Sequence, residues 1–253
     1  TELMPLSTSA EMDSLVQAMA GGRVGVVVHF DTNPVYNLSP EYKYEEAVKK
    51  VPMSITLTEQ ANETSEVSNY VLPIHNQLEA WNDFKTRTGF YSMQQPIIAP
   101  LYNTRQKEAI LLNWKEPKEF TETLYKDYLS SNWEKVIYPA MGAAAPFKKF
   151  WNSVLHDGVV YMNEKPELAG GAFAVDAFAS APKMKATNDF TILFQGNNNV
   201  GDGRFASNGW LQELPNPVTK IVWDNYAAIS VQSAAELGVD TNGTVDIAIG
   251  SRK

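Results

Sequence analysis

No cysteine occurs in the 253 residues of this chain. Without thiols the chain can form no disulfide, no zinc–thiolate site and no ordinary iron–sulfur cluster, so a buried apolar core must stabilise any fold it adopts by itself. Hydrophobic residues make up 44% of the sequence and charged residues 20%. This composition is typical of globular proteins, and the length is sufficient for one large domain or two ordinary ones.

Charge and hydropathy exclude two classes of partner. The formal net charge is -8 and lysines and arginines are scattered singly, so there is no basic stripe for nucleic acid. No apolar run approaches the ~20 residues that a bilayer-spanning helix needs, and the longest runs, Val24–Phe30 and Ala169–Ala181, are short or rich in Gly and Ala. We therefore expect no direct membrane span. Thr1–Ala10 does not resemble a signal peptide, which predicts a mature or internal start.

The N-terminal part alternates helical and strand-like patterns. Helical patterns at Glu11–Ala20 and Glu41–Lys50 are interleaved with short apolar runs at Val24–Phe30, Met53–Thr58 and Tyr70–Pro73. Such alternation predicts an α/β fold with a doubly wound, mostly parallel sheet.

The next segment lacks a regular period. Trp81–Tyr102 is aromatic and rich in proline, which predicts an ordered loop packed over the edge of the sheet. Three helices that cap the sheet are predicted after it, at Thr104–Trp114, Lys118–Trp133 and Phe147–His156. Gly, Ala and Pro then dominate as far as Pro182, which predicts a long connection.

Strand signals replace helical ones after Asn188. Three short apolar runs have the composition of strands: Phe190–Phe194, Thr219–Trp223 and Thr244–Ile249. Between the last two runs, Ser230–Leu237 predicts one helix that ends at Gly238.

These patterns predict two domains. Residues 1–187 would form an α/β dinucleotide-binding-like domain with a helical and loop extension, and residues 188–253 the beginning of an incomplete β-barrel domain. So few strands cannot close a barrel, and unpaired strand edges are costly. We therefore expect the chain to be part of a longer polypeptide.

Two local motifs could bind a ligand. The turn at residues 31–34 (DTNP) follows a predicted parallel strand, where open α/β sheets bind ligands, although Asn-Pro is also a common turn dipeptide. His75 and Glu79 are four residues apart, a spacing that could place both on one helix face to hold a metal. Without a third ligand, a surface hydrogen bond is the favoured alternative. His29 and His156 have the pattern of core-edge histidines.

Motifs that would identify an enzyme are missing from the sequence. It contains no glycine-rich phosphate loop, no GxSxG nucleophile elbow, no HExxH and no EF-hand pattern. No catalytic residue and no metal site are therefore predicted.

Several segments, in order, resemble the second half of the molybdopterin oxidoreductase family. They are residues 29–34 (HFDTNP), 62–73 (NETSEVSNYVLP) and 78–83 (LEAWND), followed by 208–215 (NGWLQELP) and 229–239 (ISVQSAAELGV). In that family the first three line the dinucleotide end of the molybdopterin cofactor, and the last two resemble the entrance to the final β-barrel domain. The resemblance implies that the cofactor-binding positions here are Asn33, Thr64 and Glu79.

A narrower resemblance is to the B-subunit family of bacterial alternative complex III, through residues 90–96 (FYSMQQP), Thr104-Arg105 and residues 208–220 (NGWLQELPNPVTK). It implies a molybdenum-free half of a subunit in a complex that oxidises quinol and passes electrons to a periplasmic carrier. The implied partners are the iron–sulfur half of the same subunit and the haem c and integral-membrane subunits. The implied location is peripheral, on the periplasmic side of the inner membrane. Iron–sulfur clusters would lie in a cysteine-rich part outside this chain, which would hold no cofactor.

Two departures from the family pattern support that implication. Asp31 stands where cofactor-binding members have a glycine, and Asn82 replaces the glycine of a WGD turn. A side chain blocks close approach of the backbone, and a carboxylate repels a pyrophosphate. The pocket at Asn33, Thr64 and Glu79 is thus expected to be vestigial and unoccupied, and the chain to be a scaffold. The alternatives are a fragment of an active molybdopterin-dependent reductase of the polysulfide or sulfoxide type, and a stand-alone sugar- or nucleotide-binding protein.

Overall fold

The N-terminal part of the chain folds around a three-stranded parallel sheet. The computed structural model describes residues 7–117, 119–142, 145–164, 175, 190–201, 203 and 205–248. Strand β1 (Val26–Phe30) pairs with β2 (Met53–Thr58), and β2 pairs with β3 (Tyr70–Pro73). The predicted mixed α/β fold with a parallel sheet is confirmed. The described strands follow chain order without a reversal, so they do not show the doubly wound arrangement.

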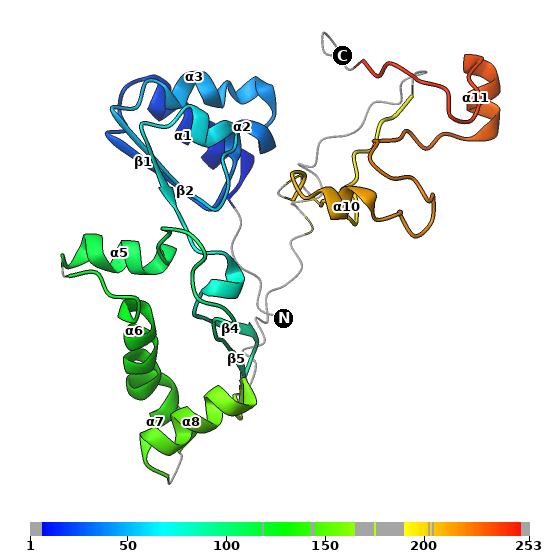
Figure 1. Ribbon diagram of the computed structural model, residues 1–253. Helices are drawn as coiled ribbons and strands as arrows, with labels where there is room; N and C mark the ends of the chain where they lie inside the picture. The colour runs from blue at the N-terminus through cyan, green and yellow to red at the C-terminus, as the bar shows by residue number, and fades with distance from the viewer. Residues whose placement is uncertain are drawn as a thin grey trace. The chain divides into compact units, whose positions relative to one another are not determined.

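Short helices accompany this sheet (Figure 1). They are α1 (Ser9–Ala20), α2 (Pro34–Asn37), the 3-10 turn η1 (Pro40–Tyr42), α3 (Tyr44–Val48) and α4 (Glu63–Glu66). Helix α1 begins with a capping box between Thr8 and Glu11, and the chain leaves it through Gly22 at φ +69°. Met19 and Val48 are buried in one cluster with Val27 packed against it, so α1 and α3 cover the face of the sheet to which Val27 points.

A second sheet forms where the sequence predicted a loop. Strands β4 (Asn82–Arg87), β5 (Phe90–Gln94) and β6 (Val159–Tyr161) make an antiparallel sheet, so the prediction of a loop over Trp81–Tyr102 is wrong for residues 82–94. Gly89 makes the hairpin possible, because it lies at φ +72° and a Cβ there would collide with the carbonyl oxygen of Met162. Aromatic residues on both faces of β5 hid the period-2 alternation of a strand.

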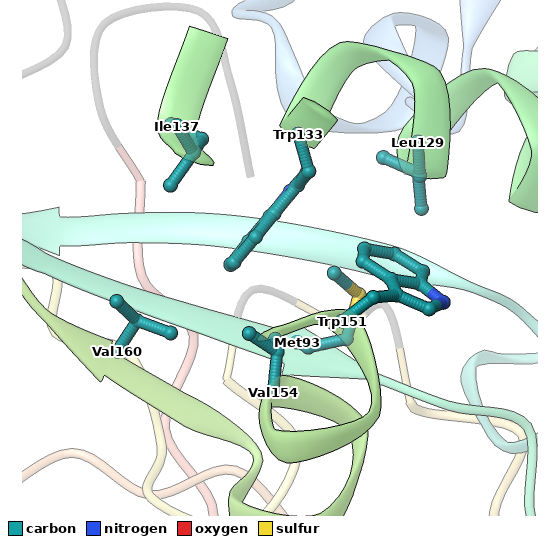
Figure 2. Packing of buried hydrophobic residues seen from close by; sticks show 7 residues of the cluster. All are labelled: Met93, Leu129, Trp133, Ile137, Trp151, Val154 and Val160. Atoms are coloured by element: carbon teal, nitrogen blue, oxygen red, sulfur yellow. The ribbon is translucent and has the colours of Figure 1, made fainter. Parts of the chain in front are cut away.

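Helices that follow in the chain pack on this antiparallel sheet: α6 (Leu124–Asn132) with its π-helical continuation η3 (Trp133–Ile137), α7 (Tyr138–Met141) and α8 (Phe147–Asp157). Helix α5 (Lys107–Lys115) precedes them, and its first residue pairs with Asp31, just after β1. The buried side chains meet between helices and strands, as Figure 2 shows: Met93, Leu129, Trp133, Ile137, Trp151, Val154 and Val160. Trp133 is completely buried, and its indole N–H donates to Asp83 Oδ2 at 2.7 Å. This bond ties the helical layer to β4.

The chain divides into two units by its contacts, Thr1–Lys183 and Met184–Lys253. The domain identities inferred from the sequence stay predictions. In the second unit, α10 (Gly209–Glu213) and α11 (Val231–Leu237) are helices. The predicted helix at α11 is confirmed, with Ser230 as its N-cap and Gly238 at φ +66° after its end.

Three predicted strands are not formed in the second unit. Residues 190–194, 219–223 and 244–248 are not strands in the structure, and Ile249 lies outside the described residues. A strand exists only through ladder bonds to a neighbour, and these apolar runs pair with no other described segment. The β-barrel therefore stays a prediction. Among the described residues, no helix is long and apolar enough to cross a membrane.

Replacing Trp133 with alanine tests the aromatic core. Trp133→Ala should lower the free energy of unfolding by about 3–5 kcal/mol, because it leaves a large cavity and removes the bond to Asp83. The matched control is Trp114→Ala, at a tryptophan that is 44% exposed, for which we expect a loss below about 1 kcal/mol. Denaturant unfolding curves measure both, and equal losses would contradict this description of the core.

Candidate functional site

The turns that follow β1 and β2 meet at the carboxyl edge of the parallel sheet. Asn33 Oδ1 accepts two hydrogen bonds from Thr64, one from the backbone N–H at 3.1 Å and one from the hydroxyl at 2.7 Å. The Thr64 hydroxyl in turn accepts the backbone N–H of Val35 at 3.1 Å. Thr64 is completely buried. The structure thus brings together two of the three predicted site residues, and we call this contact the Asn33–Thr64 junction.

The rest of the Asn33 side chain contacts the start of α4. Its Nδ2 donates to Glu63 Oε2 at 2.7 Å, and this bond is the main cause that lowers the pKa of Glu63. Asn62 caps α4 by accepting the N–H of Ser65. Asn33 is therefore bonded through both its oxygen and its nitrogen to the turn after β2.

Asp31 has a backbone conformation that favours glycine. Its φ is +54°, in the left-handed region that Asp tolerates better than most residues do. The carboxylate lies 2.8 Å from Lys107 Nζ, at the start of α5, and Lys107 also lies 5.5 Å from the centre of the Phe30 ring. The carboxylate of Asp31 is therefore paired within the chain, and its repulsion of a pyrophosphate stays a prediction.

Sequence reasoning missed Lys107, although a signal was present. A lysine in the first turn of a helix is unfavourable next to the positive end of the helix dipole. A carboxylate close to it compensates, and Asp31 supplies that carboxylate.

Glu79, the third predicted site residue, is bonded to a different set of residues. It is buried in the 3-10 turn η2 (Gln77–Glu79). Its Oε2 accepts the N–H of Asn76 at 3.1 Å, and its Oε1 accepts the N–H of Leu101 at 2.9 Å. Glu79 thus fixes two backbone segments to each other.

His75 lies beside Glu79, but the pair is neither on a helix face nor at the surface. His75 is buried, with Nδ1 at 2.7 Å from Thr104 Oγ1 and at 4.0 Å from Glu79 Oε2. Its Nε2 lies 3.7 Å from a carboxylate oxygen of Glu122. The prediction of a surface hydrogen bond is wrong about burial. In the part of the chain that the structure describes, no group of three or more His, Cys, Asp or Glu side chains could hold a metal ion.

A buried chain of hydrogen bonds reaches the junction from the core. His29 lies between Tyr44 and Thr56 at 2.9 Å on each side, and Thr56 is 2.7 Å from the hydroxyl of Ser68. Ser68 donates to the carbonyl oxygen of Thr64 at 2.8 Å. Because that carbonyl can only accept, the hydroxyls of Ser68 and Thr56 must each donate toward it, so His29 carries a proton on Nδ1 and donates it to Thr56.

Burial shifts the pKa values of His29 and Tyr44, the two ionisable groups in this series of hydrogen bonds, in opposite directions. It lowers the pKa of His29 and raises the pKa of Tyr44 to about 12. Both groups are therefore neutral near pH 7. Since the series of bonds ends at a peptide carbonyl, it cannot pass a proton outward, and its effect is to hold the Thr64 peptide in place.

Comparison with known proteins gives one informative similarity. No family model matches the chain. The menaquinone reductase, molybdopterin-binding-like subunit of Nitratidesulfovibrio vulgaris is 26% identical over 163 residues, which are 62% of this chain and 22% of that protein. The similarity supports the predicted resemblance to the molybdopterin oxidoreductase family. The chain spans about a fifth of the length of that relative.

A looser structural similarity is to acetylene hydratase from Pelobacter acetylenicus. The TM-score is 0.45 at 12% sequence identity, over 62% of this chain and 22% of that one. A superposition of this quality adds no argument about fold or function.

The Asn33–Thr64 junction can be tested by a double-mutant cycle. Asn33→Ala and Thr64→Val should each lower the free energy of unfolding by about 1–3 kcal/mol, because each leaves a partner without its hydrogen bonds. The double variant should lose less than the sum of the two, because both remove the same contact. Asn37→Ala, at an exposed asparagine of α2, is the control. Strict additivity would show that the junction contributes no coupling.

The neutral state of His29 predicts a pH dependence of stability. Because burial lowers its pKa below the unfolded value of 6.5, the unfolded chain binds a proton at a pH where the folded chain does not. The free energy of unfolding should therefore be highest above about pH 6.5 and should fall as the pH drops toward the folded pKa. His29→Gln should remove this part of the slope. Superimposable slopes for the parent and the variant would contradict a neutral His29.

Proposed function

We propose that this chain is a cofactor-free structural module of a quinone-linked respiratory oxidoreductase. The relative that supports the proposal is described as a molybdopterin-binding-like subunit of a menaquinone reductase. The main structural support is that the chain closes its own turns at the carboxyl edge of the parallel sheet. Asn33 is bonded to Thr64 and Glu63, and Asp31 is paired with Lys107.

These residues do not fit a cofactor pyrophosphate as they stand. The ammonium group of Lys107 would attract a phosphate, but it is already paired with the Asp31 carboxylate. The Oδ1 atom of Asn33 accepts two hydrogen bonds from Thr64, so both of its acceptor positions are used within the chain. A pyrophosphate at this edge would have to displace internal bonds and would meet a carboxylate, which favours a structural role for the turns.

The narrower form of the proposal places the chain in a quinol-oxidising complex of the alternative complex III type. There it would hold the cluster-bearing half of its subunit in register with the haem c and integral-membrane subunits, on the periplasmic side of the inner membrane. The similarity of residues 90–96 and 208–220 to that family supports this form.

One observation favours the rival function, an active molybdopterin-dependent reductase. The backbone of Asp31 keeps a glycine-like φ of +54°, and Asn33, Thr64 and Glu79 are all present. A glycine would adopt the same conformation without strain, and Lys107 is a cation within reach of the turn. Molybdenum and nucleotide analysis of the whole polypeptide distinguishes the two functions. Our proposal expects neither in stoichiometric amount.

Asp31→Gly tests the proposal in the assembled complex. With no phosphate to repel, the variant should leave quinol oxidation within about twofold of the parent. The partly exposed Asp31–Lys107 ion pair contributes at most about 1 kcal/mol to the stability of the fold, so its loss should not prevent assembly. Glycine suits φ +54°, but it also loosens the unfolded chain by up to ~1 kcal/mol, so activity is measured per assembled complex.

Asp31→Asn is the matched control, because it removes the charge and keeps the side chain. A several-fold change in activity with Asp31→Gly, or a nucleotide released on denaturation of the parent, would refute a cofactor-free module. Tighter nucleotide binding by both variants would identify the rival function.

A further inference from the structure

One face of the parallel sheet carries apolar side chains that stay exposed. Five neighbours in the strand register share this face: Val26, Val28, Met53, Ile55 and Tyr70. Side chains alternate along a strand, so these five point away from α1 and α3, which cover the other face. Tyr70 is 56% exposed, Val26 52%, Met53 40% and Val28 39%. We call the five residues the open sheet face.

Parallel sheets rarely leave such a face in water, because helices normally cover them on both sides. Covering begins at the carboxyl end of this face, where Leu57 is completely buried and Lys107 of α5 lies 5.5 Å from the centre of the Phe30 ring. Exposed apolar residues elsewhere, such as Ile97 and Val231, lie outside strands, so no rule of sheet packing says what covers them. The open sheet face is different, since its architecture calls for a layer of helix.

The crossovers of this chain lie on the opposite face. Helix α3, between β1 and β2, packs with Val27. Ser68, between β2 and β3, lies 2.7 Å from the hydroxyl of Thr56, which points to the same face as Val27. Both connections lead in one direction across the sheet, and right-handed crossovers that run in one direction all lie on one face. Crossovers on the open sheet face must therefore run in the reverse direction, toward strands beyond β1.

The two edges of the sheet show where a strand can be added. The edge at β3 is occupied, because Ile74 forms a parallel bridge with Arg105, and the N–H of His75 donates to the carbonyl oxygen of Arg105 at 3.1 Å. Among the described residues, β2 is the one strand that pairs with β1. The outer edge of β1 is thus the edge at which the sheet can continue.

This topology favours the rest of the same polypeptide as the occupant. A crossover links two strands of one sheet covalently, so a crossover helix on the open sheet face belongs to the chain that supplies the strands. The described residues of the second unit form no strand that could be joined to β1 in this way. A longer chain has residues available, since the matched region is 22% of the length of the menaquinone reductase relative.

We propose that a part of the same polypeptide outside residues 1–253 adds a parallel strand to the outer edge of β1 and covers the open sheet face with a crossover helix. Such a strand would complete the doubly wound arrangement that the sequence predicts. The inference rests on the sheet and goes beyond the proposed function. Metal and nucleotide analysis does not touch it, so the two proposals can fail separately.

Site-specific photocrosslinking in the full-length polypeptide, expressed in its native cells, identifies what covers the face. Benzoylphenylalanine in place of Tyr70 or Met53 should crosslink to one and the same segment outside residues 1–253, without a species of higher mass on a denaturing gel. The matched control is Val71, which is 45% exposed and adjacent to Tyr70 but points to the other face, so a probe there should not reach that segment. Crosslinks to a separate protein, to a second copy, to lipid or to residues 1–253, or no crosslink at all, would each overturn the proposal.

Amide hydrogen exchange in the same polypeptide tests the added strand. The N–H groups of β1 that point away from β2 should exchange at least about tenfold more slowly than those of an unstructured peptide, because a paired edge must open before it exchanges. The N–H groups of β1 that point to β2 are the internal reference. Unprotected exchange confined to the outer side of β1 would overturn the proposal.

A charge on the open sheet face gives a further readout. Tyr70→Asp should remove the crosslink from Met53 and lower the melting temperature of the full-length polypeptide, because it places an unpaired carboxylate under the covering helix. Val71→Asp, the matched control, should keep that crosslink. A crosslink retained in Tyr70→Asp, or lost equally in both variants, would overturn the proposal. If Tyr70→Asp does not fold, the crosslinks and the exchange of the parent still decide.

Discussion

The Asn33–Thr64 junction is the contact on which the parallel part of the structure depends. Two parallel strands cannot be joined by a tight hairpin, so the ends of β1 and β2 must be fixed by contacts between segments distant in sequence. Thr64 gives both its N–H and its hydroxyl to Asn33, and its carbonyl accepts from Ser68. A completely buried threonine is thus fully used by its neighbours, and the turns on either side have little freedom to move apart.

The charges around this junction are compensated inside the chain, which is the basis of the scaffold proposal. Asp31 pairs with Lys107, and Asn33 lowers the pKa of Glu63 by donating to it. The same residue types could serve a ligand, as the resemblance to molybdopterin enzymes implies for Asn33. Their bonds here are directed to other residues of the chain. Glu79 is likewise bonded within the chain, since its carboxylate accepts the backbone N–H of Leu101.

Prediction from sequence succeeded for segments whose local residue pattern is sufficient to define a strand or a helix. Strands β2 and β3 lie where their β-branched runs predicted them, and α11 ends at Gly238 as expected of a left-handed cap. It failed where structure depends on a distant partner. The β4–β5 hairpin pairs with β6 about seventy residues later in the chain, so local periodicity could not reveal it. The run at residues 219–223 has strand composition, but no described segment pairs with it as a strand.

The sequence by itself determined the mixed α/β class with a parallel sheet and the absence of thiol chemistry, because hydrophobic periodicity and the lack of cysteine can be seen without any tertiary contact. The contact between Asn33 and Thr64 is seen only in the structure. Only the tertiary structure decided what those residues do. Side-chain charge and hydrogen bonding depend on which neighbour lies within about 3 Å. Lys107, 76 positions away from Asp31, supplies such a neighbour, and no local pattern encodes that distance.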